Sequence, residues 1–238
     1  MYICIMQIEI IFEDNYIVII NKPNNILIHN SYYARNIKEA TLLEILKQQM
    51  GSTLYPVHRL DRKTSGTLML AKKQENVAVF QKLFNTNQIE KVYLAIVRGF
   101  VTKSRIIDTP VKNPDTQSYK EAKTLCEPIF TKLLAIPVHP YEVSRYSLVK
   151  LTPATGRMHQ LRIHMNKISY PIIGDSKYGD RFHNRMFEQQ LNCYNLFLHA
   201  YAISFVHPIF NKKIIVKAPF PIDWKSIFKK FDWKYLEK

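Results

Sequence analysis

The sequence predicts an α+β fold in which a mixed, mainly antiparallel β-sheet is flanked by helices and loops. Segments with strand character outnumber segments with helical periodicity. Neighbouring strand segments are joined as in hairpins, and no regular strand–helix–strand alternation runs along the chain. The sequence contains no internal repeats and no low-complexity linker, so residues 1–238 are expected to form a single domain.

The N-terminal part of the sequence predicts a hairpin, two helices and two further strands. Alternating apolar residues around the turn signal Glu13-Asp14-Asn15 place the hairpin at residues 7–12 and 16–20. Leucines at helical spacing before Gly51 predict a helix over residues 38–50, because glycine commonly ends helices. The remaining elements are expected at residues 67–72 (strand), 74–87 (helix) and 89–98 (strand).

The C-terminal part predicts three more strands and two more helices. On the helix expected at residues 157–169, His159 and Arg162 are three residues apart and should project together beside the buried stripe. Residues 102–128 are polar and rich in turn formers, and the sequence assigns them no element. The other elements are strands at residues 141–151, 196–206 and 212–218 and a helix at residues 224–231.

The composition describes a folded, basic protein. Hydrophobic residues make up 47% of the chain, which is enough to form a core, and 34 lysines and arginines exceed 19 acidic residues to give a net charge of +15. Such a charge favours a polyanionic partner, either nucleic acid or an anionic membrane. The longest apolar runs are too short to span a membrane, and the first residues do not resemble a signal peptide. We therefore expect a cytoplasmic protein.

Neither a disulfide framework nor a metal site is predicted. The three cysteines, Cys4, Cys126 and Cys193, show no CxxC spacing. His159 and His164 are five residues apart, which would place them on different faces of a helix. No phosphate-binding glycine loop is present in the sequence either.

The densest cluster of chemically capable residues surrounds Asp61. This one carboxylate lies between basic residues in PVHRLDRKTSG, and the neighbouring positive charges favour its ionised form. An ionised carboxylate in a basic groove can act as a nucleophile or a base on a polyanionic substrate. The alternative is an ordinary turn in which Asp61 caps a backbone N–H and pairs with arginine, and the residues alone favour that alternative.

Six segments in order resemble the RluA family of pseudouridine synthases. HRLDRKTSG followed by TLMLAK is similar to the family's catalytic motif, and FEDNYIVIINKPNNILIH to its N-terminal motif. KVYLAIVRG, TGRMHQLRIHM, PIIGDSKYGD and LFLHAYAISFVHP resemble the later motifs. Together they cover about residues 10 to 210. The resemblance implies the catalytic fold of that family and an isomerase that converts a uridine in RNA to pseudouridine and needs no cofactor. Because the chain starts almost directly at the predicted hairpin, we expect no separate S4-type RNA-binding domain.

The resemblance also implies roles for individual residues. Asp61 would be the nucleophile or base, Arg162 its basic partner, and Tyr93 an aromatic residue against the target base. From the residues alone, Arg162 could equally form a surface ion pair and Tyr93 could pack in the core. His58 is expected to stabilise the loop, and Gly66 and Gly156 to adopt turn conformations. The residues expected to bind RNA are Arg59, Arg62, Lys63, Arg157 and His159.

The segments around residues 145–187 most resemble family members that modify tRNA. We therefore expect a tRNA substrate modified in the T-stem or acceptor region, and a monomer that needs no protein partner and does not bind membranes. Large-subunit ribosomal RNA is the alternative substrate. A non-catalytic RNA-binding or RNA-folding protein and, more remotely, a hydrolase using Asp61 are the alternative functions.

Overall fold

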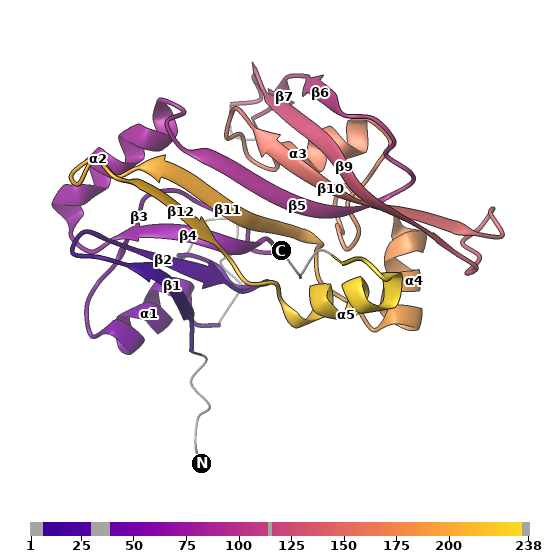
Figure 1. The fold of residues 1–238 in the computed structure, drawn as a ribbon, viewed down its shortest axis with the longest axis horizontal. Helices are drawn as coiled ribbons and strands as arrows, with labels where there is room; N and C mark the ends of the chain where they lie inside the picture. Colours follow the sequence, from indigo (N-terminus) through magenta and orange to yellow (C-terminus); the bar gives the residue numbers. More distant parts are fainter. Residues whose placement is uncertain (1–6, 30–38, 114–115, 235–238) are drawn as a thin grey trace, which may run out of the picture. The chain divides into compact units, whose positions relative to one another are not determined.

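A computed structural model describes residues 7–29, 39–113 and 116–234 of the chain. It contains two compact units. The first comprises Met1–Glu90 and Ala200–Pro219, and the second comprises Lys91–His199 and Phe220–Lys238. Each unit combines helices with antiparallel strand pairs, which confirms the α+β class (Figure 1). The expectation of one domain over the whole chain stays a prediction.

The first unit is built on the predicted hairpin. Strands β1 (Glu9–Glu13) and β2 (Ile17–Lys22) pair antiparallel, and β2 pairs antiparallel with β4 (Ser65–Ala71). The short β3 (Tyr55–Pro56) pairs with β4, while β11 (Leu198–Val206) lies beside β4 and pairs with β12 (Lys213–Lys217). All seven residues of β4 are buried, which agrees with its largely apolar sequence.

Two helices complete the first unit. Helix α1 (Leu42–Met50) begins at a capping box, in which the Glu44 carboxylate accepts a hydrogen bond from the Thr41 N–H at 2.7 Å. It ends at Gly51, as predicted, but begins after the expected residue 38, which lies outside the described residues. Helix α2 (Gln74–Asn85) packs Phe80 into a core formed by β2, β4 and β11.

The second unit contains a four-stranded antiparallel arrangement. Its strand order is β5 (Glu90–Arg98), β10 (Ser144–Pro153), β9 (Lys123–Leu134) and β6 (Arg105–Asp108). Strands β9 and β10 form the long hairpin visible in Figure 1. A separate two-stranded piece is formed by β7 (Val111–Lys112) and β8 (Tyr119–Lys120). Residues 102–128, which the sequence left unassigned, thus contain β6 to β8 and the start of β9.

Three helices belong to the second unit: α3 (Gln160–Lys167), α4 (Arg181–Leu191) and α5 (Ile222–Phe231). Helix α3 starts three residues later than predicted because His159 has the left-handed backbone angle φ 56°. Helix α4 was not predicted. No helix in the described part of the chain is both long and apolar enough to cross a membrane.

Both cysteines within the described residues are buried, unpaired thiols. Burial raises the pKa of Cys126 and of Cys193 to about 11. Neither is therefore a reactive thiolate at neutral pH. Cys4 lies outside the described residues.

Candidate active site

The loop that carries Asp61 connects β3 to β4 in the first unit. Leu60, the residue before it, is buried, and the side chain of Asp61 is half-buried. The Thr64 N–H donates a hydrogen bond to the Asp61 carbonyl oxygen at 3.1 Å, which closes a tight turn. Arg59 is exposed near the start of this loop.

His58 fixes the start of the loop. The Met69 N–H donates to its Nε2 atom at 2.9 Å, so the proton of the neutral imidazole is on Nδ1. The imidazole also stacks on Phe84, with ring centroids 4.3 Å apart. These contacts confirm the expectation that His58 stabilises the loop.

Lys22 is the main support of the loop, and the sequence argument missed it. This lysine at the end of β2 is completely buried. Its ammonium group donates hydrogen bonds to the carbonyl oxygens of Pro23 at 2.8 Å, Arg62 at 2.9 Å and Thr64 at 2.8 Å. Burial lowers its pKa to about 7, although the charge of Asp61 acts in the opposite direction. The sequence signal was a lone lysine ending an apolar strand.

Two further hydrogen bonds connect the loop to the turn after β2. The Asn24 side-chain amide donates to the Lys63 carbonyl oxygen at 2.6 Å. Arg62 donates from Nε to the Asn25 carbonyl oxygen at 3.0 Å, and its Nη2 lies 3.6 Å from the Glu39 carboxylate. Arg62 thus has local structural partners, and its contact with RNA stays a prediction.

Gly66 allows β4 to pass close to its neighbour. Its φ of +110° is one that other residues rarely adopt, and an added Cβ would lie 2.3 Å from the Ala200 carbonyl oxygen. This confirms the expected special role of Gly66. The same expectation for Gly156 was wrong, because its backbone does not have a positive φ and no atom lies within 4 Å of the position that a Cβ would take.

In the second unit, two buried polar residues anchor the start of α3. The Gln160 side-chain amide donates to the Lys123 carbonyl oxygen and to Thr124 Oγ1, both at 3.0 Å. Thr124 Oγ1 also lies 2.9 Å from His164 Nδ1, and His164 Nε2 donates to the Thr109 carbonyl oxygen at 2.9 Å. Burial lowers the pKa of His164, so the ring stays neutral. The histidine is structural.

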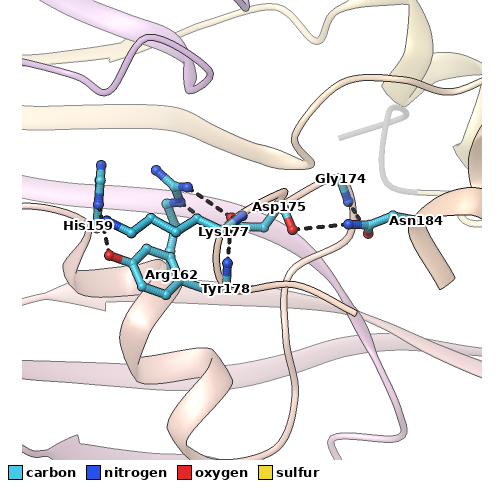
Figure 2. Close-up of polar contacts among 7 residues, drawn as sticks. All are labelled: His159, Arg162, Gly174, Asp175, Lys177, Tyr178 and Asn184. Carbon is cyan, nitrogen blue, oxygen red and sulfur yellow. Dashed lines mark hydrogen bonds and ion pairs between the residues drawn. The ribbon is translucent and has the colours of Figure 1, made fainter. Parts of the chain in front are cut away.

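Arg162 and Asp175 form a buried two-point ion pair (Figure 2). Arg162 Nε donates to Asp175 Oδ2 at 2.7 Å, and Nη2 donates to Oδ1 at 2.9 Å. Asp175 also accepts hydrogen bonds from two backbone N–H groups. Burial alone would raise the pKa of Asp175, but these bonds and the arginine charge outweigh it and lower the pKa. The expected pairing of Arg162 with Asp61 joins residues of different units and stays a prediction.

Tyr178 covers one side of the Arg162 guanidinium. The carbon Cζ of Arg162 lies 5.2 Å from the centre of the tyrosine ring, and the Tyr178 hydroxyl lies 3.1 Å from His159 Nδ1 (Figure 2). His159 precedes α3 and does not lie on it, so the predicted helical spacing with Arg162 was wrong. The two residues are instead connected through Tyr178.

Tyr93 and Arg157 are the other predicted residues of this unit. Tyr93 lies on β5 opposite Leu151 and packs partly against the apolar core, which leaves both the catalytic and the structural interpretation open. Arg157 is exposed, and its Nε donates to the Glu121 carbonyl oxygen at 3.0 Å. Among the described residues, no group of histidine, cysteine or acidic side chains could hold a metal ion.

The residues that could act chemically are therefore a half-buried carboxylate, a fixed guanidinium and a phenol. A carboxylate can attack carbon or remove a proton, and a guanidinium can stabilise developing negative charge. Asp61 belongs to the first unit, and Arg162 and Tyr93 belong to the second. Two supporting residues were absent from the predicted site. Lys22 holds the loop that carries Asp61, and Asp175 holds the Arg162 guanidinium.

A protein-family model agrees with the motif positions. The model described as RNA pseudouridylate synthase matches residues 15–167, which include Asp61, Tyr93 and Arg162.

Two curated proteins that are similar over nearly the whole chain have the same name. The tRNA pseudouridine synthase C of Haemophilus influenzae is 35% identical, and the match covers 96% of this chain and 99% of that protein. The tRNA pseudouridine synthase C of Pasteurella multocida is 37% identical, with 96% and 98% covered.

Two solved human structures show the same fold. Human RNA Pseudouridylate Synthase Domain Containing 4 matches with a TM-score of 0.70 and 22% identity over 94% of this chain and 93% of that one. Human RNA Pseudouridylate Synthase Domain Containing 1 matches with a TM-score of 0.71 and 21% identity over 91% and 85%.

Proposed function

Because this chain belongs to the RNA pseudouridylate synthase family, we propose that it is the isomerase that converts one uridine of tRNA to pseudouridine. Family membership confirms the resemblance seen in the ordered motifs. The single observation that carries the tRNA assignment is the identity of 35% to 37% over nearly the full chain to proteins named tRNA pseudouridine synthase C. We place the target uridine in the T-stem or acceptor region.

The reaction rearranges one nucleotide without redox change. The bond between N1 of uracil and C1′ of ribose breaks, the base turns, and a bond forms between C5 and C1′. The proton on C5 is then removed and N1 gains a proton. Atoms therefore balance within the nucleotide and solvent.

Asp61 is the proposed reacting carboxylate. It either attacks C1′ and forms a covalent intermediate or removes the 2′ proton so that uracil departs. Both routes need an ionised carboxylate at a fixed position. The support is the rigid loop, since Lys22 and Asn24 hold three of its carbonyl oxygens through short hydrogen bonds.

Arg162 and Tyr93 are the proposed partners of Asp61. A guanidinium can orient a carboxylate and stabilise the negative charge on the departing uracil. Tyr93 would lie against the base and take part in removing the C5 proton. Both roles follow from the positions of these residues in the family motifs.

RNA binding is assigned to the basic residues of the two motifs. A stacked uridine must leave the helix before its C1′ can be reached, at a cost of a few kcal/mol. We propose that the exposed Arg59 occupies the vacated space, because guanidinium planes stack on bases. Arg62, Lys63, Arg157 and His159 would contact the nearby backbone. We further propose that the enzyme acts as a cytoplasmic monomer.

The test uses purified protein and unmodified RNA transcripts. A set of tRNA transcripts and a large-subunit ribosomal RNA fragment are incubated with the enzyme, and pseudouridine is mapped by carbodiimide modification. We expect one uridine of a tRNA to react, with the same yield when a chelator is present. Selective modification of the ribosomal fragment would overturn the tRNA assignment.

A second experiment, with variants of the protein, distinguishes a catalytic function from a non-catalytic RNA-binding role. In a strain that lacks the modification, Asp61→Asn should bind tRNA and leave it unmodified. Glu75→Gln is the matched control, since this exposed carboxylate of the same unit pairs only loosely with Lys73 at 3.8 Å. Restoration of the growth phenotype by Asp61→Asn would favour a non-catalytic RNA-folding role.

A further inference from the structure

Asp175 is the most constrained carboxylate in the described part of the second unit. It is 1% exposed and follows Gly174 in the segment before α4. Its Oδ1 atom accepts hydrogen bonds from the N–H groups of Lys177 at 2.9 Å and Tyr178 at 3.0 Å. The carboxylate is therefore held by its own backbone as well as by Arg162.

The carboxylate determines how the Arg162 guanidinium is oriented. Two parallel N–H···O bonds, from Nε and Nη2, fix both the position and the plane of the group. A guanidinium carries five N–H donors, so three lie outside this contact. Tyr178 limits movement on one face, with its ring centre 5.2 Å from Cζ. Arg162 is thus presented in one orientation.

The pairing also explains why the burial of Arg162 is tolerated. Arg162 is 6% exposed, and an unpaired charge at such a depth would be costly. Asp175 neutralises it and retains a lowered pKa, so the pair carries no net charge. The contribution of Asp175 to a reaction is consequently the position and orientation of the Arg162 guanidinium.

The backbone around Asp175 is held separately from the carboxylate. Asn184 on α4 donates from Nδ2 to the Asp175 carbonyl oxygen at 3.0 Å, and its Oδ1 accepts from the Gly174 N–H at 2.8 Å (Figure 2). Asn184 therefore maintains the same segment through hydrogen bonds that do not involve Arg162. A substitution of Asn184 is thus a matched control for a substitution of the Asp175 carboxylate.

We propose that Asp175 is a positioning residue of the isomerase, which fixes the Arg162 guanidinium so that the group faces the reacting nucleotide in one orientation. This inference rests on the proposed function, because it takes Arg162 as part of the catalytic machinery. Asp175 itself touches no substrate. Tyr178, fixed in turn by His159, completes the support of the guanidinium.

The first test compares Asp175→Asn with Asn184→Ala under single- and multiple-turnover conditions. Asp175→Asn keeps the side-chain volume and loses one strong acceptor, so kcat should fall by about 100-fold while KM for tRNA stays within a factor of about three. Asn184→Ala should lower the melting temperature and leave kcat nearly unchanged. Equal effects of the two variants on kcat would overturn the proposal and assign Asp175 to the fold alone.

Chemical rescue tests the proposal without changing Asp175. Arg162→Ala should regain activity with added guanidinium ion at concentrations that do not unfold it, because a carboxylate with two parallel acceptors selects this ion. Methylammonium, which cannot form the two-point contact, should not restore activity. Equal rescue by both ions, or by neither, would contradict the positioning role.

A spectroscopic measurement separates this proposal from the proposed function. The Nε–H signal of Arg162 in ¹⁵N-labelled protein should be protected from exchange in the wild type and in Asn184→Ala, and lost in Asp175→Asn. If all variants and the wild type leave RNA unmodified, the proposed function fails, and the signal still reports whether Asp175 holds Arg162. Retention of the protected signal in Asp175→Asn would overturn the positioning role.

Discussion

The ammonium nitrogen of Lys22 lies 2.9 Å from the main-chain carbonyl oxygen of Arg62, next to Asp61 in the loop. Lys22 is completely buried and also donates to the Thr64 carbonyl oxygen on the other side of the turn. Fully buried lysines are rare because the charge must be compensated. The conformation of the proposed catalytic loop therefore depends on one buried lysine side chain.

Replacing Lys22 should disturb the loop. Lys22→Met removes three donors from buried or half-buried carbonyl oxygens, and we expect the free energy of unfolding to fall by about 3 kcal/mol. The rate of pseudouridine formation should fall as well. Urea denaturation and a single-turnover assay measure the two effects.

The matched control for this variant is Lys72→Met. Lys72 belongs to the same unit and pairs with Glu13 at the surface, where ion pairs contribute about 1 kcal/mol or less. Lys72→Met should change the free energy of unfolding and the rate of pseudouridine formation only slightly. An equally small effect of Lys22→Met would contradict the support role of Lys22.

The lowered pKa of Lys22 predicts a pH dependence of stability. Lys22 has a pKa of about 7 in the folded protein, whereas an unperturbed lysine titrates near 10.5. Between these values the unfolded chain binds one proton more, so the contribution of Lys22 to stability is lost as pH falls towards 7. The free energy of unfolding of the wild type, relative to Lys22→Met, should rise with pH by at most about 1.4 kcal/mol per unit. Urea denaturation of both proteins at pH 6 to 10 measures this difference in the free energy of unfolding. A difference that decreases as pH rises would show that the folded protein favours the charged form of Lys22.

Gly66 should tolerate no side chain. In Gly66→Ala the new Cβ would lie 2.3 Å from the Ala200 carbonyl oxygen, and the φ of +110° would be strained. We expect a destabilisation of about 3 kcal/mol or more, read from the melting temperature. Gly156→Ala, with open space around the added atom, should change stability by about 0.5 kcal/mol or less. Similar melting temperatures for the two variants would contradict the close packing at Gly66.

Helices and strands with a clear periodicity of apolar residues were predictable from the sequence. The β1–β2 hairpin, α2 and β4 lie close to their expected positions because their apolar residues follow one pattern and end at turn residues. The start of α3 was misplaced, since a left-handed His159 interrupts a sequence that is otherwise helical. Helix α4 was not predicted although Asp180 caps it, because most of its residues are polar and its buried face includes His183, so its apolar periodicity is weak.

The reacting residues of the candidate site were predictable from the sequence, and among their supports so were His58 and Gly66, whereas Lys22 and Asp175 were not. Asp61 stands out because it is one carboxylate among bases, and Arg162 because it belongs to a recognisable motif. The contact of Lys22 with the loop spans 40 residues of sequence, and Asp175 meets Arg162 across 13. Such contacts depend on how strands and loops pack, which no local pattern encodes.

The most direct test of the account follows the hydrogen on C5 of uracil. A tRNA transcribed with uridine tritiated at C5 releases tritium to water only when that carbon forms the new bond to ribose. We predict stoichiometric release from one uridine per tRNA with the wild-type protein and with Glu75→Gln, and none with Asp61→Asn. Release by Asp61→Asn at the wild-type rate would contradict the assignment of Asp61 as the reacting carboxylate.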